Sequence, residues 1–276
     1  NKSVWVQTVG TNANQSSTTE SDGFKANSGG LSFGADYKVQ SNFVIGLNGG
    51  FAQSNIKSSG GAKSISIDTY QAGIYSGYNF SNYFINTTAG IALNNYNSTR
   101  QISIANASAK AKYNGQSYMA RIEIGSNNQI SGRNLTFTPT FALTAAHNTI
   151  GSYSEKGADT LNLSVKNSGA NFLETRIGAE LSSIFLTKDA SQIRPQFSLS
   201  YGYDLIGDSQ KASSSFVGQN ANFATQGAKV AQGSLKVGTG ISFATASNLT
   251  FSVNYGFEHR ENYIANSAWL RAGYRF

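Results

Sequence analysis

Cysteine is absent from this chain of 276 residues, which also has only two prolines, two histidines and 13% charged residues. Without cysteine there is no disulfide framework and no thiolate metal site. Soluble domains carry about 25% charged residues, so this chain is poor in the charges that keep a surface soluble. No apolar run approaches the roughly 18 to 20 residues that a membrane-spanning helix needs. These deficits exclude a disulfide-rich domain and a helical membrane protein.

The net charge of +7 does not point to nucleic acid, because the 21 basic residues are scattered singly rather than clustered. Phosphate-loop, zinc and dinucleotide signatures are also missing. The sequence "GTG" at 238–240 lies inside a strand pattern and opens no helix. We therefore expect no nucleic-acid partner, no cofactor and no metal.

The most abundant signal is alternation with a period of two, which indicates strands with one apolar face. In 249–259, Leu249, Phe251 and Val253 share one face, while Thr250 and Ser252 share the other. A mean hydropathy of -0.29 fits this dilution of apolar residues by polar ones. Strands of a membrane-spanning barrel alternate in this way.

Twelve such strands are predicted, so the expected fold is all-β: a 12-stranded antiparallel transmembrane β-barrel of the outer membrane, formed by residues 1–276 as one domain. The expected ranges are 2–9, 28–39, 43–57, 65–80, 83–100, 106–127, 135–153, 161–186, 193–207, 229–244, 249–260 and 266–276.

Connections of two kinds alternate along the chain. Tight turns are expected at 40–42, 81–82, 131–134, 187–192 and 245–248, and longer polar loops at 11–23, 58–64 and 208–230. Outer-membrane barrels have short periplasmic turns and long external loops. With an even number of strands, both termini are predicted to be periplasmic. Pro139 and Pro195 fall early in strands, and proline belongs at strand starts, edges or bulges.

If the apolar faces meet lipid, the polar faces line the interior. The expected interior charges are Asp36, Lys38, Arg121, Glu123, Glu174, Arg176, Glu180, Arg194, Asp204, Lys236, Glu258, Arg271 and Arg275. They are of mixed sign, whereas an ion-selective pore is expected to show rings of one sign. Most strands also place a glycine inward, which either leaves room for a polypeptide in the bore or only relieves strand curvature.

An enzyme is not expected. His147 and His259 each lie near the loop end of a strand and point outward in this phasing. A nucleophile and base need a third group to orient the base, and no such set is evident. A lipid hydrolase using His147 is the weakest of the alternatives.

Several segments together resemble the translocator β-domains of autotransporters, the type V secretion systems of Gram-negative bacteria. They are "VWVQTVG" at 4–10, residues 29–55, residues 68–97, "SYSEKGADTLNLSV" at 152–165 and the ending "AWLRAGYRF". The resemblance implies a twelve-stranded barrel that exports a covalently linked N-terminal passenger, with a helix running through its lumen. It also implies that the closing strand is read by the barrel assembly machinery, which places that signal at Leu270, Ala272, Tyr274 and Phe276.

The chain as given begins almost directly with its first strand, so the lumenal helix and the passenger are expected to lie outside it, and self-cleavage at Asn1 is not supported. The alternative is a free-standing pore or adhesin barrel. The expected partners are outer-membrane lipid and lipopolysaccharide, the latter through loop lysines such as Lys63, Lys110, Lys112 and Lys211. The barrel is expected to be a monomer.

Overall fold

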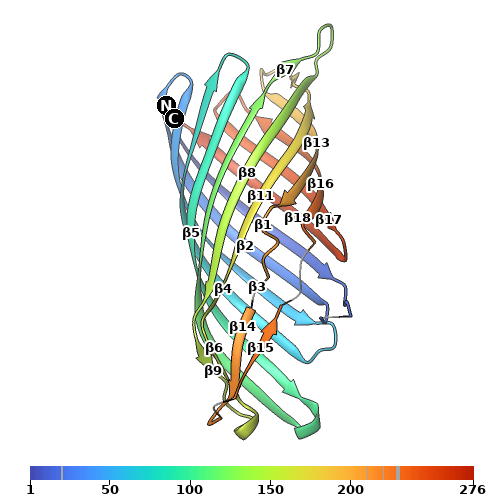
Figure 1. The fold of residues 1–276 in the computed structure, drawn as a ribbon. Coiled ribbons are helices and arrows are strands. Elements are labelled where there is room, and N and C mark those ends of the chain that lie inside the picture. Colours follow the sequence, from blue (N-terminus) through green and yellow to red (C-terminus); the bar gives the residue numbers. More distant parts are fainter. Residues whose placement is uncertain (20, 210, 220, 228–230) are drawn as a thin grey trace.

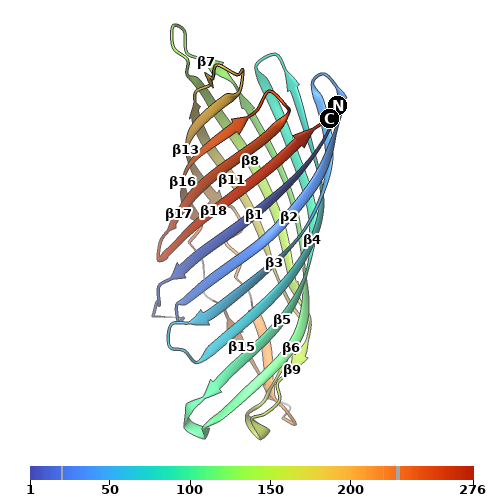
Figure 2. The same cartoon turned by 180° about the vertical axis from the view of Figure 1, so that it is seen from behind.

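Twelve long antiparallel strands close into a barrel in this structure, a computed structural model that describes residues 1–19, 21–209, 211–219, 221–227 and 231–276 (Figures 1 and 2). The barrel strands are β1 (Lys2–Gln15), β2 (Phe24–Gln40), β3 (Phe43–Ser58), β4 (Lys63–Phe80), β5 (Tyr83–Ile102), β6 (Ala107–Ser126), β8 (Thr136–Ile150), β11 (Ser168–Ser182), β13 (Gln192–Asp204), β16 (Gly233–Ala244), β17 (Leu249–Arg260) and β18 (Tyr263–Arg275). The predicted strand number and fold class are confirmed.

Each barrel strand pairs with its neighbour in the chain, and β18 pairs with β1 to close the sheet. The closing ladder begins at the chain ends, where Lys2 and Phe276 exchange backbone hydrogen bonds of 3.0 and 2.9 Å. No helix in the described part of the chain is long and apolar enough to cross a membrane.

The remaining elements are short. β7 (Asn128–Gln129) and β12 (Phe185–Leu186) extend the barrel sheet, and η1 (Ser103–Ala105) and η2 (Asp159–Leu161) are single 3-10 turns. A second sheet of four strands has the order β15 (Asn222–Gln226), β14 (Lys211–Phe216), β10 (Leu163–Val165), β9 (Tyr153–Ser154). We call it the loop-end sheet.

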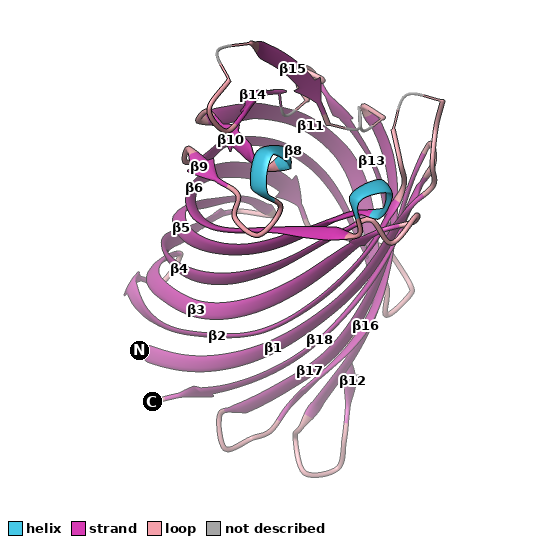
Figure 3. Cartoon of the chain, turned by 90° about the horizontal axis from the view of Figure 1, so that it is seen from below, coloured by secondary structure: helices cyan, strands magenta, loops and turns pink. Residues whose placement is uncertain are grey.

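The two ends of the barrel differ. Both termini lie together at one end, which we call the terminal end (Figure 1). The connections at this end include two-residue turns at 41–42 and 81–82, and the opposite end, the loop end, carries the long connections 16–23, 151–167 and 205–232. Figure 3 looks at the loop end and shows the loop-end sheet beside β8 and β11.

Some predicted boundaries are wrong at the loop end. Residues 11–15, expected in a loop, continue β1, because Thr11 and Asn12 bond across the ladder to Ser267 and Asn27. The loop expected at 208–230 contains β14 and β15, although residues 210, 220 and 228–230 lie outside the described residues. At the terminal end, the turn expected at 131–134 lies within a longer connection that includes β7, and the turn expected at 187–192 follows β12 and reaches the first residue of β13.

Both prolines lie where the sheet is interrupted on one side. The β6 ladder ends at the pair Gly125–Thr140 and the β7 ladder resumes at Phe137, so Pro139 falls in the gap. In the same way, Pro195 falls between the last β11 pair and the first β12 pair. Proline cannot donate a backbone hydrogen bond, and at these two positions the missing donor breaks no ladder on that side.

Candidate functional site: the two faces of the barrel wall

The outer face of the wall carries a band of exposed apolar side chains, of which Leu47 at 65% and Phe33 at 58% are examples. On β5 the band runs from Tyr83 to Leu93, and the next outward residue is Asn95. The ten steps from Tyr83 to Leu93, at ~3.4 Å each and tilted by ~40°, give a height of about 26 Å. The band therefore matches the hydrocarbon thickness that outer-membrane barrels cover.

Aromatic rings border the band at both ends. At the terminal end, Tyr78, Phe80 and Tyr83 form a stack with ring centroids 5.9 and 5.5 Å apart. At the opposite border, Phe51 and Tyr70 lie 5.3 Å apart. Such girdles mark the two membrane interfaces of an outer-membrane barrel.

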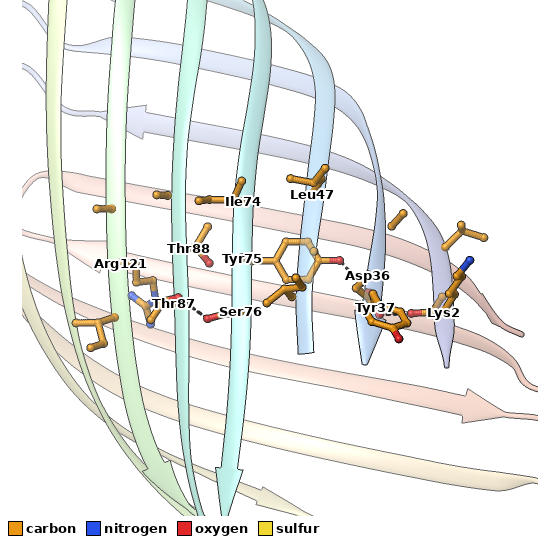
Figure 4. A pocket seen from close by; sticks show the side chains of 18 of the residues that line it. Lys2, Asp36, Tyr37, Leu47, Ile74, Tyr75, Ser76, Thr87, Thr88 and Arg121 are labelled. Atoms are coloured by element: carbon orange, nitrogen blue, oxygen red, sulfur yellow. Dashed lines mark hydrogen bonds between the residues drawn. The ribbon is translucent and has the colours of Figure 1, made fainter. Parts of the chain in front are cut away.

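Two hydroxyl groups inside the band satisfy each other. Ser76 Oγ and Thr87 Oγ1 lie 2.8 Å apart on facing positions of β4 and β5, a contact drawn in Figure 4. An unpaired polar group in hydrocarbon is costly, so this pairing makes both side chains compatible with lipid.

The inner face is the strand face opposite the band. Twelve of the thirteen expected interior charges form the candidate lumenal site, and all twelve occupy positions on this face: Asp36, Arg121, Glu123, Glu174, Arg176, Glu180, Arg194, Asp204, Lys236, Glu258, Arg271 and Arg275. Lys38 occupies the same face and is exposed. The structure brings most of the twelve into pairs or clusters.

The most buried cluster centres on Glu174 and Arg176, which are 4% and 8% exposed. Arg176 Nε and Nη2 donate to the two oxygens of Glu174, both at 2.9 Å. The same guanidinium donates to Ser200 and Ser234 at 3.2 and 2.7 Å. The side chain lies across Gly202, where an added Cβ would collide with it. Every charged atom of this pair therefore has a partner, as a buried ion pair requires.

The cluster continues onto β16 and β17. Arg260 Nη2 lies 3.5 Å from Glu174 Oε2, and its Nε donates to Glu258 at 2.7 Å. Lys236 Nζ lies 3.4 Å from Glu258. Arg260 was not among the expected interior charges, although its two-residue spacing from Glu258 places it on the same face. The result is a chain of alternating charges along one side of the interior.

Two further ion pairs are more exposed. Arg121 pairs with Glu123 at 2.6 Å, and Arg194 pairs with Glu180 at 2.8 Å. Asp204, in contrast, accepts backbone hydrogen bonds from Leu173 and Ile206. The inner wall thus presents opposite charges in local pairs, and no ring of one sign appears among the described residues.

A cluster near the terminal end spans the closing seam. Trp5 Nε1 on β1 donates to Tyr75 OH at 2.8 Å, and that hydroxyl donates to Asp36 Oδ2 at 2.9 Å, the contact visible in Figure 4. Ser3 Oγ also bonds to Asp36. Arg271 on β18 lies over the Trp5 ring, 4.2 Å from its centroid, in a cation–π contact. One inner-wall cluster therefore ties β1 to β2, β4 and β18.

At the loop end, Glu155 fastens the loop-end sheet to the barrel. It accepts two hydrogen bonds from Arg100 on β5 at 3.1 and 2.5 Å and one from the Leu163 amide at 2.9 Å. Tyr153 stacks on Tyr113 with centroids 4.0 Å apart. Burial, followed by the nearby Glu155 carboxylate, raises the pKa of Tyr153, so its phenol stays neutral.

Replacing Glu155 by Gln should loosen this attachment, because the bidentate bond to Arg100 is lost while side-chain size is kept. We expect trypsin to cleave after Lys156 or Lys166 at least ~5-fold faster than in the unaltered chain, which mass spectrometry of the fragments would show. Asp159→Asn in the same connection removes a charge that is exposed and serves as the control. Equal cleavage rates in all three chains would contradict the role given to Glu155.

The two histidines lie on the outer face, as expected. His147 Nδ1 is 2.8 Å from Asn171 Oδ1, and His259 faces Leu235 and Ile264 across the sheet. Among the described residues, neither histidine forms a hydrogen bond with a serine or threonine hydroxyl, and no group of three or more potential metal ligands occurs. The geometry around them provides no nucleophile and base pair.

The family model "Autotransporter beta-domain" matches residues 4–256. The chain belongs to the autotransporter β-domain family. Outer membrane protein A of Rickettsia conorii is 24% identical over 99% of this chain, and Outer membrane protein B of Rickettsia typhi is 22% identical over 99%. The chain spans only 14% and 17% of the length of these two relatives.

Two solved translocator barrels have a similar fold. The translocator domain of the autotransporter NalP from Neisseria meningitidis superposes with a TM-score of 0.79 at 15% identity, covering 100% of this chain and 88% of that one. The β domain of the Bordetella autotransporter BrkA gives 0.76 at 14% identity, covering 100% and 99%. At these identities the likeness establishes the fold of this β-domain, an outer-membrane β-barrel.

Proposed function

We propose that this β-domain mediates the export and surface anchoring of an N-terminal passenger through its lumen, with residues 1–276 acting as one translocator domain. Membership of the autotransporter family over residues 4–256 is the observation that carries the proposal. The inner wall supports it, because its charges are paired locally and leave polar, hydrated surfaces that suit a polypeptide linker. The charged inner-wall residues described above are the candidate linker contacts.

We further propose that the terminal end is periplasmic and the loop end external. Short turns at the terminal end and long connections at the loop end support this orientation. Leu270, Ala272, Tyr274 and Phe276 lie on the outer face at the end of β18 and are the proposed signal for the barrel assembly machinery. Lipopolysaccharide is the proposed partner at the loop end, and the barrel is proposed to act as a monomer.

The decisive experiment is peptide mapping of the native outer-membrane protein, combined with added protease on intact cells. We expect a long region preceding Asn1, shaved from the cell surface while the barrel stays protected. A signal-peptide cleavage site directly before Asn1 would instead favour the second candidate, a free-standing pore or adhesin barrel. Cleavage of the turn at 41–42 on intact cells would contradict the proposed orientation.

Deleting Phe276 tests the assembly signal. We expect the amount of folded barrel in the outer membrane to fall at least ~10-fold, measured as heat-modifiable mobility on gels, because the last outward aromatic residue is lost. Deleting Leu186, an exposed apolar residue of β12 at the same end, is the control and should leave most of the barrel folded. Refolding of both purified chains in detergent separates failed recognition from failed folding.

A further inference from the structure

Strands β2 to β6 continue well beyond the apolar band at the loop end. On β5, residues 95–102 extend the strand past Leu93, a length of about 24 Å. Figure 2 shows the hairpin β5–β6 reaching further than the hairpin β17–β18. The outward side chains of this extension are polar, as Asn95, Asn97 and Thr99 on β5 show.

Cross-strand pairing aligns its outward side chains in rows. The row that we call the lysine rung consists of Lys25, Lys57, Ser64, Thr99, Lys110 and Lys156. Thr99 is six residues beyond Leu93, so the rung lies about 20 Å along the strand from the band, or about 15 Å above it after tilt. Its four lysines are all exposed.

The lysines on this rung face one another. Lys25 is directly opposite Lys57, and Lys110 is directly opposite Lys156, with backbone hydrogen bonds of 2.8 and 2.9 Å between the latter two. Like charges at directly opposite positions destabilise a sheet. Among the described residues of the rung there is no Asp or Glu to compensate them. An anion bound between the lysines would remove this repulsion.

The next row toward the band has a different chemistry. It consists of Asn27, Asn55, Ser66, Asn97 and Lys112. Carboxamide and hydroxyl groups both donate and accept hydrogen bonds, which suits a polyhydroxylated ligand. In the row closest to the band, the carboxylate of Asp68 already accepts a hydrogen bond from Gln53 at 2.9 Å. This carboxylate therefore already has a hydrogen-bond partner, and it lies two rows away from the lysine rung.

We propose that this face, the outer side of β2 to β6 beyond the apolar band, binds the phosphorylated saccharide of outer-leaflet lipopolysaccharide. The band continues directly into this face, so a lipid anchored beside the band presents its headgroup to these rows. The lysine rung contacts phosphate groups, and the amide row contacts sugar hydroxyls. Contact of this face with the outer leaflet in cells rests on the orientation proposed above, in which the loop end is external. Lys63 lies on the inner-face register with Arg100, and Lys211 belongs to β14, so neither is part of this face.

The test uses the purified barrel in detergent, where orientation plays no role, so its outcome is independent of the translocator proposal. Native mass spectrometry would measure binding of phosphorylated lipopolysaccharide, the same lipopolysaccharide after dephosphorylation, and phosphatidylglycerol. The test variant is Lys57→Gln/Lys110→Gln/Lys156→Gln. The control, Lys2→Gln/Lys38→Gln/Lys188→Gln, removes the same charge from exposed positions at the terminal end.

We expect the test variant to bind phosphorylated lipopolysaccharide at least ~10-fold more weakly and the control to stay within ~2-fold of the unaltered barrel. Dephosphorylation should weaken binding to the unaltered barrel by a similar factor. Equal losses in both variants, no loss in the test variant, or equal binding of phosphatidylglycerol would overturn the proposal. Lys57→Gln alone, without lipid, should raise the melting temperature slightly, because it relieves repulsion from Lys25. A fall would contradict the strained pairing.

Discussion

Replacing Arg176 by Met is expected to lower the free energy of unfolding by about 3 to 5 kcal/mol, because it leaves a buried carboxylate without its main partner. Glu174 would keep Arg260, at 3.5 Å, and the Ser234 hydroxyl, which donates to its Oε2 at 3.4 Å. The two serine hydroxyls that now accept from Arg176 would also lose a donor. Urea unfolding of the barrel in phospholipid vesicles, followed by tryptophan fluorescence, measures the change.

Two further variants test whether the loss comes from an unpaired buried charge. The double variant Glu174→Met/Arg176→Met removes both charges, and we expect it to lie within about 2 kcal/mol of the unaltered barrel, since apolar replacements of a buried pair are often tolerated. Arg194→Met makes the same substitution in a pair whose arginine is 43% exposed, where about 1 kcal/mol or less is expected. If Arg176→Met lowers the free energy of unfolding no more than Arg194→Met, burial of the Glu174–Arg176 pair has no energetic consequence.

Replacing Gly46 by Ala is expected to cost about 2 to 4 kcal/mol. An added Cβ would lie closer than 3.0 Å to the ring of Tyr75, which overpacks the inner wall. To escape, the ring must leave its hydrogen bonds with Trp5 and Asp36, each worth about 1 kcal/mol. The seam between β1 and β18 would also lose support for the indole on which Arg271 lies. The same unfolding assay reports the loss.

Gly10→Ala is the matched control, because no atom lies within 4 Å of its added Cβ and the residue is also in a barrel strand. A change within about 0.5 kcal/mol is expected there, as for an exposed surface substitution. Tyr75→Phe separates the two causes in Gly46→Ala, since it removes the hydroxyl without adding volume. If Gly46→Ala and Gly10→Ala behave alike, the close packing of the ring has no energetic consequence.

Sequence alternation was sufficient to predict the strands of the barrel. In 249–260 the predicted and observed limits coincide, because every second side chain from Leu249 to Phe257 is apolar and a polar turn flanks the strand on each side. The sequence predicted which glycines face inward, but not what each of them packs against. The structure shows several of them beneath a neighbour's side chain, as Gly34 lies beneath Trp5 and Gly125 beneath Phe84. This packing is the expected use of a strand glycine.

Features that depend on strand register could not be predicted. The partnership of Arg176 with Ser234 joins residues on β11 and β16, and the lysine rung joins Lys57 to Lys110 across β4 and β5. A shift of two residues in any ladder would preserve the alternation while changing these neighbours. The loop-end sheet was missed because β9 and β10 are two and three residues long, too short for a periodic signal.

Barrel closure depends on the last residues of the chain. Eleven of the twelve barrel pairings join consecutive strands, and only the ladder from Ser3–Arg275 onward joins the two ends. As the sheet assembles, strands that are neighbours in the chain can pair quickly through local contacts, whereas the most non-local contact, between β1 and β18, forms only when both of these strands are in place. Until then the nascent sheet exposes the edges of β1 and of its newest strand, both open to pairing with other chains. Those two edges therefore need protection until Phe276 pairs with Lys2 and the sheet closes.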